Sequence, residues 1–368
     1  MEPMAEDFMP LDGWDYLEFW VGNAKQAAYF YEHAMGFTRT AYAGPETGLR
    51  DRASYVLEQG DIRFVVTTAL REEHEITRHL AKHGDGVKNI ALTVPDATQA
   101  YREAVSRGAR SVAEPETVED EFGKIERSAI ATYGDTIHTF VNRSDYAGPF
   151  LPGYVSLSEN GHRDPGVGLL TLDHLVGNVE LGKMNYWVEF YETVFGMTNI
   201  LHFGDDQIQT EYSALMSKVM SSGNGKIKFP INEPAEGKRK SQIEEYVEFY
   251  GGAGVQHIAL ASSDIVGTVE AMKARGFQFL DTPDSYYEEA PDRVGEIAED
   301  YEVLQQHKIL VDRDDDGYLL QIFTKTAQDR PTVFFEVIER HGATTFGEGN
   351  FKALFEAIER EQALRGNL

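Results

Sequence analysis

The chain has 368 residues, a formal net charge of −27 at pH 7 and no cysteine. So acidic a surface repels phosphate groups, which argues against nucleic acid and anionic membranes as partners. Without cysteine there are no disulfides, thiolate metal sites or cysteine nucleophiles, so a bound metal must have nitrogen and oxygen ligands. No signal peptide or membrane span is visible, and we expect a cytoplasmic protein.

The first half of the chain predicts two consecutive βαβββ units. Apolar periodicity and turn residues indicate the following elements: a strand at 15–21, a helix at 23–35, a hairpin with strands 53–58 and 62–69, a strand at 89–94, a helix at 96–107, and strands near 111–117, 125–132 and 136–142. The proline- and glycine-containing stretch that follows predicts a linker at 149–168. We therefore expect an N-terminal domain at 1–148 and a C-terminal domain at 169–368.

The second half repeats this order of elements. The expected elements are a strand at 171–177, a helix through 195, strands near 197–203, 208–218 and 226–231, a strand at 257–262, a helix at 264–275, and strands near 308–312, 318–324 and 332–338. A capping-box pattern at Ser241–Glu244 opens a further helix that should end at Gly251. The predicted fold is α+β, with four tandem βαβββ units in two pseudo-repeated half-barrel domains.

Comparison of the two halves isolates three polar side chains in apolar strands. Three aligned positions have a coordinating side chain only in the second half: His174 opposite Phe19, His257 opposite Asn89, and Glu336 opposite Phe140. A lone histidine in an apolar strand is usually a core residue. A carboxylate within Phe334–Ile338, however, is costly to bury without a partner, and one bound cation accounts for all three residues.

Two imidazoles and one carboxylate leave coordination positions open, an arrangement typical of non-haem Fe(II) oxygenases. Zinc or manganese could use the same ligands. Glu336 offsets half of a +2 charge, so an anionic chelating substrate would complete neutralisation.

Two other motifs receive simpler interpretations. Asp312–Gly317 resembles the start of a calcium loop, but the twelfth position is Phe323 instead of glutamate, so we predict a hairpin turn, with Asp120–Gly123 as its counterpart. His79 and His83 have the spacing of helical metal ligands without an acidic partner, which favours a solvated helix face.

Longer blocks carry a family resemblance that covers essentially the whole chain and is densest after residue 170. These blocks are Phe229–Pro234, Lys240–Ile243, Gly254–Leu260, Leu320–Lys325 and Phe346–Phe351. The chain resembles the 4-hydroxyphenylpyruvate dioxygenase family of the vicinal-oxygen-chelate superfamily. The resemblance implies an Fe(II) enzyme of tyrosine breakdown that converts 4-hydroxyphenylpyruvate and O2 into homogentisate and CO2.

Carried over by position, the family's iron ligands fall on His174, His257 and Glu336, the same set that the repeat isolates. The resemblance implies catalytic and substrate-binding roles for four amides and substrate contacts for four further residues: Asn232, Gln242, Gln256 and Gln321, with Ser217, Phe323, Phe346 and Phe351. The family usually has a basic residue at the position of Glu348. This difference puts in question only the kinetics of a C-terminal lid over the site.

Two alternatives remain open. One is the 4-hydroxymandelate synthase family, which uses the same substrate and iron but hydroxylates the benzylic carbon. The other is a metal-free binding protein on the same fold. The amphipathic tail, Gly349–Gly366, is expected to close the site as a helix. We expect a homo-oligomer, with the ligand-free first half as the candidate subunit interface.

Overall fold

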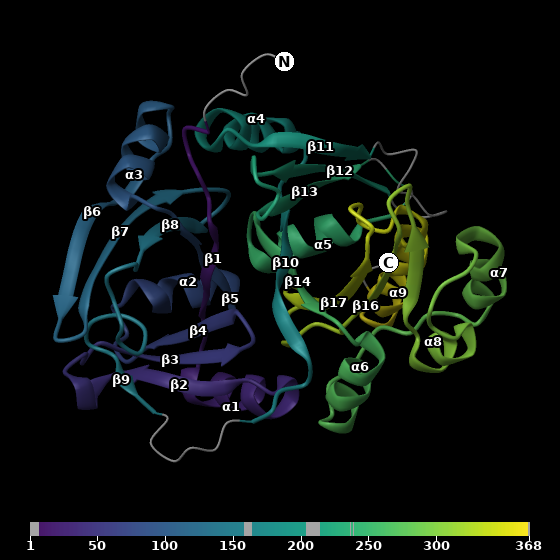
Figure 1. The fold of residues 1–368 in the computed structure, drawn as a ribbon, viewed down its shortest axis with the longest axis horizontal. Helices are drawn as coiled ribbons and strands as arrows, with labels where there is room; N and C mark the ends of the chain where they lie inside the picture. The colour runs from purple at the N-terminus through teal and green to yellow at the C-terminus, as the bar shows by residue number, and fades with distance from the viewer. Residues whose placement is uncertain (1–6, 158–163, 204–213, 236, 238, 367–368) are drawn as a thin grey trace.

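Two curled half-barrel sheets form the protein (Figure 1). The computed structural model describes residues 7–157, 164–203, 214–235, 237 and 239–366. The first sheet has the order β6-β7-β8-β5-β1-β4-β3-β2-β9, and the second has the order β11-β12-β13-β10-β14-β17-β16-β15. The two orders correspond strand for strand apart from β9. The expected fold class, four βαβββ units in two pairs, is confirmed.

The strands of the first sheet are β1 (Gly13–Trp20), β2 (Thr38–Ala43), β3 (Arg52–Gln59), β4 (Ile62–Ala69), β5 (Gly86–Thr93), β6 (Ser111–Asp120), β7 (Gly123–Ala131), β8 (Ile137–Asn142) and β9 (Val155–Ser156). Those of the second are β10 (Leu169–Asn178), β11 (Thr198–Phe203), β12 (Ala214–Ser221), β13 (Lys228–Ala235), β14 (Gly254–Ser262), β15 (Leu310–Arg313), β16 (Tyr318–Phe323) and β17 (Phe334–His341). The beginning of the strand predicted at 208–218 lies outside the described residues.

The helices are α1 (Ala24–Met35), α2 (Glu75–His83), α3 (Ala97–Ser106), α4 (Met184–Phe195), α5 (Gln242–Tyr250), α6 (Ile265–Ala274), α7 (Ser285–Val294), α8 (Tyr301–His307) and α9 (Glu348–Leu364). Side-chain caps define several of these starts: Ser241 accepts a hydrogen bond from the backbone N–H of Glu244, and α5 ends at Gly251 as expected. No helix in the described part of the chain is long and apolar enough to cross a membrane.

The predicted elements differ from the structure at short or polar segments. From the sequence, β2, α7 and α8 were not expected, and α2 was expected only as a helix face carrying His79 and His83. β9 pairs with β2 inside the predicted linker. The two expected hairpin turns are confirmed, because β6 pairs with β7 and β15 pairs with β16 across them.

The interpretation of His79 and His83 as a solvated helix face is wrong. Both side chains are buried, 7% and 1% exposed respectively. His83 contacts the carbonyl oxygen of Tyr250 through Nδ1 and Asp135 through Nε2, at 2.5 and 2.8 Å. The cluster therefore joins α2 to the second half of the chain, which a local charge pattern does not reveal.

Strand register also corrects the alignment of the two halves. Tyr16 pairs with Ala91 as His174 pairs with Ala259, and Asn89 pairs with Ile137 as His257 pairs with Phe334. The counterparts of His174, His257 and Glu336 are consequently Tyr16, Asn89 and Thr139, so the pairings with Phe19 and Phe140 were wrong. The aligned Val-Gly-Asn motifs are not equivalent, because Val176–Asn178 end β10 whereas Val21–Asn23 follow the end of β1.

An ion pair present in both halves supports this correspondence. Arg143 donates to both carboxylate oxygens of Asp15, at 2.7 and 2.5 Å. Arg340 donates to both oxygens of Asp173 in the same way, at 2.7 and 2.8 Å. These residues occupy the equivalent positions that the strand register assigns.

Candidate metal centre

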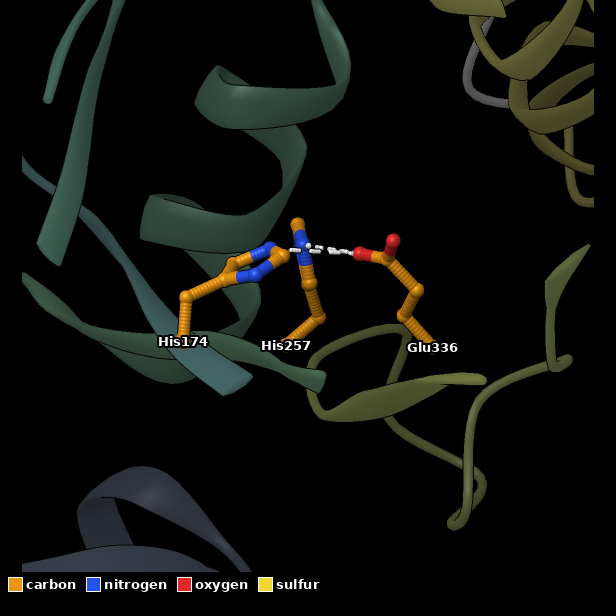
Figure 2. Close-up of side chains that lie close together, drawn as sticks. All are labelled: His174, His257 and Glu336. Carbon is orange, nitrogen blue, oxygen red and sulfur yellow. Dashed lines mark ion pairs between the residues drawn. The ribbon is translucent and has the colours of Figure 1, made fainter. Parts of the chain in front are cut away.

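Three side chains from adjacent central strands converge in the second sheet (Figure 2). His174 lies on β10, His257 on β14 and Glu336 on β17, which neighbour one another in the sheet. The Nε2 atoms of both histidines are 3.3 Å from Oε2 of Glu336. All three residues are buried, with exposed fractions of 3%, 7% and 2%.

The spacing of these atoms fits a bound cation. Metal bonds of about 2.1 Å place neighbouring ligand atoms about 3.0 to 3.4 Å apart. A carboxylate buried among apolar strands is costly unless a charge compensates it. The set offers two imidazole nitrogens and one carboxylate oxygen, ligands that suit Fe(II), Mn(II) and Zn(II).

Each proposed ligand has a second contact that fixes its orientation. Nδ1 of His174 lies 2.7 Å from Oδ1 of Asp173, and Nδ1 of His257 lies 3.1 Å from Oε1 of Gln256. Because these oxygens accept, each Nδ1 carries the proton and each Nε2 offers its lone pair to a metal. Gln321 donates from Nε2 to Oε1 of Glu336, at 3.2 Å.

β-Bulges explain how two of these partners reach the site. In the pairing of β10 with β14, Asp173 and Gln256 are the residues skipped by the register. At a β-bulge the alternation of side chains between the two faces of the sheet is interrupted, so two consecutive residues can point to the same face. Gln256 can therefore line the pocket beside His257, and Asp173 can contact the adjacent His174.

The charges of the site are mutually dependent. Burial opposes the charging of His174, but Glu336 and Asp173 outweigh it and raise the pKa of this imidazole. Burial lowers the pKa of His257, against the effect of Glu336. Burial disfavours the carboxylate of Glu336, yet the two histidines hold its pKa below the ordinary value.

The proposed substrate residues lie around one small cavity beside the three ligands. Its volume is about 60 Å³. The structure brings together all eight residues of the predicted set: Ser217, Asn232, Gln242, Gln256, Gln321, Phe323, Phe346 and Phe351. Within the part of the chain that the structure describes, Oε1 of Gln242 is buried without a hydrogen-bond partner, so this wall can accept a hydrogen bond from a ligand.

Several lining residues were not anticipated. Val176, Phe203, Leu215, Val219, Leu354 and Phe355 complete the walls, together with Pro230 from the block Phe229–Pro234. Leu354 and Phe355 come from α9, and the apolar stripe of the tail was the available signal for them. A larger cavity of about 520 Å³ adjoins the site, shares Gln242 and Gln256 with it, and is bordered by the later part of α9.

A cavity of about 710 Å³, larger than these two, lies in the first half. Tyr16, Asn89 and Thr139, the counterparts of the proposed ligands, line it. A phenol, an amide and a hydroxyl are poor ligands for a transition metal compared with imidazole and carboxylate. Ligand chemistry, not cavity size, therefore identifies the metal centre.

Known proteins resemble this chain along nearly its whole length. The family model described as Hydroxyphenylpyruvate dioxygenase, HPPD, N-terminal matches residues 5–150, and that of the Glyoxalase/Bleomycin resistance protein/Dioxygenase superfamily matches residues 171–322. The 4-hydroxyphenylpyruvate dioxygenase of Aspergillus fumigatus is 49% identical over 97% of this chain and 94% of its own length. That of Xenopus tropicalis is 49% identical over 96% and 92%.

A solved structure extends the comparison. A mutant of 4-hydroxymandelate synthase from Streptomyces coelicolor is 34% identical, covers 96% of this chain and 100% of its own, and superposes with a TM-score of 0.86. The paired sheets place the protein in the glyoxalase and dioxygenase superfamily, and the buried His-His-Glu set could hold a metal ion. Within that class, the chain belongs to the 4-hydroxyphenylpyruvate dioxygenase family.

Proposed function

We propose that the protein converts 4-hydroxyphenylpyruvate and O2 into homogentisate and CO2, with Fe(II) held by His174, His257 and Glu336. The convergence of these three side chains at one buried point is the observation that carries the proposal. Family membership supports the substrate class, a 2-oxo acid, because the relatives are named for that reaction.

The donor set fits iron. When bound, Fe(II) supplies chelation of the keto acid and activation of O2. The chain orients the ligands, since Asp173, Gln256 and Gln321 each hold one of them by a hydrogen bond. Glu336 alone neutralises half of the metal's charge, so an anionic substrate completes the balance.

The walls of the cavity position the substrate ring. Phe323, Phe346 and Phe351 supply apolar surfaces that pack against an aromatic ring and exclude water. Ser217, Asn232 and Gln242 offer hydrogen-bonding groups without a formal charge. We assign the phenol of the substrate to this polar wall, where Oε1 of Gln242 has no partner among the described residues.

Two alternative functions make different predictions. A 4-hydroxymandelate synthase would use the same metal and substrate, and the solved relative of that name favours keeping this alternative. The family resemblance implies that Asn232 and Pro230 match the homogentisate-forming type, whereas an aliphatic residue at the position of Asn232 is typical of the mandelate-forming type. The buried triad, in which each proposed ligand is oriented by a hydrogen bond, argues against a metal-free binding protein.

One experiment separates these functions. The protein is loaded with Fe(II) without oxygen, mixed with 4-hydroxyphenylpyruvate and then O2, and the product is identified by mass and chromatography. Homogentisate as the main product supports the proposal. Chiefly 4-hydroxymandelate would replace it by the alternative enzyme, and no product with no bound iron would favour a binding protein.

We also propose the division into a metal-free domain at 1–148, a linker at 149–168 and a catalytic domain at 169–368, and a cytoplasmic homo-oligomer. The first half is the proposed subunit interface because it lacks the ligand set. Analytical ultracentrifugation of the full chain tests the assembly, and a monomer at all concentrations would reject it.

A further inference from the structure

A second cluster of potential metal ligands lies on the opposite face of the strand that carries Glu336. Side chains alternate along a strand, so Glu339 and His341 of β17 point away from the face of Glu336. Glu299, from the segment between α7 and α8, joins them. Among the described residues, only this group and the catalytic triad bring three histidine or acidic ligand atoms within 4.8 Å of one another.

The atomic distances match those of a metal site. Nε2 of His341 is 3.0 Å from Oε1 of Glu339 and 3.2 Å from Oε1 of Glu299. These separations resemble the 3.3 Å of the catalytic triad and the spacing of about 3.0 to 3.4 Å expected around a metal with bonds of about 2.1 Å.

Hydrogen bonding alone does not satisfy this cluster. Nε2 of His341 is buried and has no hydrogen-bond partner among the described residues, although both carboxylates lie within 3.2 Å, so its N–H direction points at neither oxygen. Oε2 of Glu299 is also buried and unpartnered. An ion between the three groups would contact the lone pair of Nε2 and both carboxylates at once.

The charge and the surroundings of the cluster also favour a dication. Two carboxylates and a neutral imidazole carry a charge of −2, which a divalent ion cancels. The groups are held in place: Oε2 of Glu339 accepts from the backbone N–H of Ile265 at 2.7 Å, and Tyr318 stacks on His341 with ring centroids 4.4 Å apart. Such second contacts are typical of oriented metal ligands.

We propose that Glu299, Glu339 and His341 bind a divalent transition-metal ion, with zinc as the best match to one nitrogen and two oxygen ligands and water as a further ligand. The ion would tie the segment between α7 and α8 to β17. Its role is structural, because it lies on the far side of the strand from the substrate cavity. The site does not depend on the proposed function.

The test counts zinc equivalents on the full-length chain. Metal-free protein titrated with Zn²⁺ against a chromophoric chelator should bind two equivalents. His341→Gln and Glu299→Gln should each bind one, as should His174→Ala, which removes the catalytic site instead. In His174→Ala, zinc should raise the melting temperature, and the double variant His174→Ala, His341→Gln should lose that shift.

Glu270→Gln is the matched control. His307 and Glu270 form an ion pair with the same 3.2 Å distance but without a third ligand, so this variant should still bind two equivalents. A single equivalent that disappears in His174→Ala would overturn the proposal. So would a second equivalent that persists in both His341→Gln and Glu299→Gln, or one that binds only at millimolar zinc.

Discussion

Asn350 donates a hydrogen bond from Nδ2 to Oε1 of Gln321, at 3.0 Å. Gln321 in turn donates to Glu336, at 3.2 Å. The start of α9 is therefore linked by two hydrogen bonds to the carboxylate of the metal centre. Asn350 is fully buried, so we expect docking of the tail helix and orientation of this proposed ligand to depend on each other.

Replacing Asn350 by leucine should weaken iron binding as well as the docking of α9. The change leaves Oε1 of Gln321 unpaired, which costs about 1 to 3 kcal/mol, and loss of an outer partner of a ligand typically lowers metal affinity about 10- to 100-fold. Iron affinity and thermal unfolding would be measured together. Gln362→Leu is the control on the same helix, because neither amide atom of buried Gln362 has a hydrogen-bond partner in residues 7–157, 164–203, 214–235, 237 and 239–366. Equal iron affinity in the two variants would contradict the coupling.

His174→Ala, His257→Ala and Glu336→Gln should each abolish turnover and bound iron while the fold persists. The three atoms share one metal, so removal of any of them opens the coordination shell. Iron content after gel filtration and circular dichroism give the two readouts. His33→Ala is the control, since that imidazole is exposed on α1, with 54% of its side chain accessible. Full activity in His257→Ala would reject the site.

Gly347→Ala should disturb the tail more than its backbone strain alone explains. Gly347 has φ of +75°, and a Cβ there would approach Oε1 of Gln321 to 1.9 Å. Gly366 has nearly the same φ, +76°, with nothing within 4 Å, so Gly366→Ala has a similar strain without the clash. We expect Gly347→Ala to lower kcat and the yield of product per O2 consumed. Identical kinetics in the two variants would show that the tail does not close the site.

Asn232→Ile should change the product. Asn232 lines the cavity and donates to Oδ1 of Asn178 at 3.4 Å. An aliphatic side chain cannot hold the ring hydroxyl or the neighbouring amides, at about 1 kcal/mol for each neutral hydrogen bond lost. We expect loss of homogentisate, with part of the flux diverted to benzylic hydroxylation or unproductive release. Chromatography of the products gives the ratio, and an unchanged homogentisate yield would exclude a role for Asn232 in selectivity.

Stability should fall between pH 6.5 and about 4 because of His138. This imidazole is fully buried, its Nε2 lies 2.8 Å from the hydroxyl of Tyr191, and burial lowers its pKa to about 4. The unfolded chain binds a proton near pH 6.5 that the folded chain does not. The contribution of His138 is therefore complete above pH 6.5 and decreases as pH falls, by about 3 kcal/mol in total.

Urea unfolding of the protein and of His138→Phe at several pH values measures this contribution. The difference between the two free energies of unfolding should vary with pH only inside that window. His79, whose pKa burial lowers to about 3, acts in the same direction but is common to both proteins. A pH-independent difference would contradict the assignment.

The apolar periodicity and the repeat were sufficient to predict the four βαβββ units. A strand of a half-barrel buries one face or both. The spacing of apolar residues along the strand therefore indicates which faces are buried. The proposed ligands His174, His257 and Glu336 were visible because imidazole and carboxylate in apolar strands require a compensating partner. The short strand β2 and the polar helices α7 and α8 were missed because their patterns resemble those of loops.

Only the tertiary structure decided which residues share a face and a neighbour. The strand pairings show that Tyr16 and Thr139, instead of Phe19 and Phe140, are the counterparts of His174 and Glu336. Asn350 reaches Glu336 through Gln321 because α9 docks on the sheet, a contact that no local pattern encodes. Periodicity depends on burial along one segment, whereas register, docking and ligand geometry depend on distances between segments far apart in the chain.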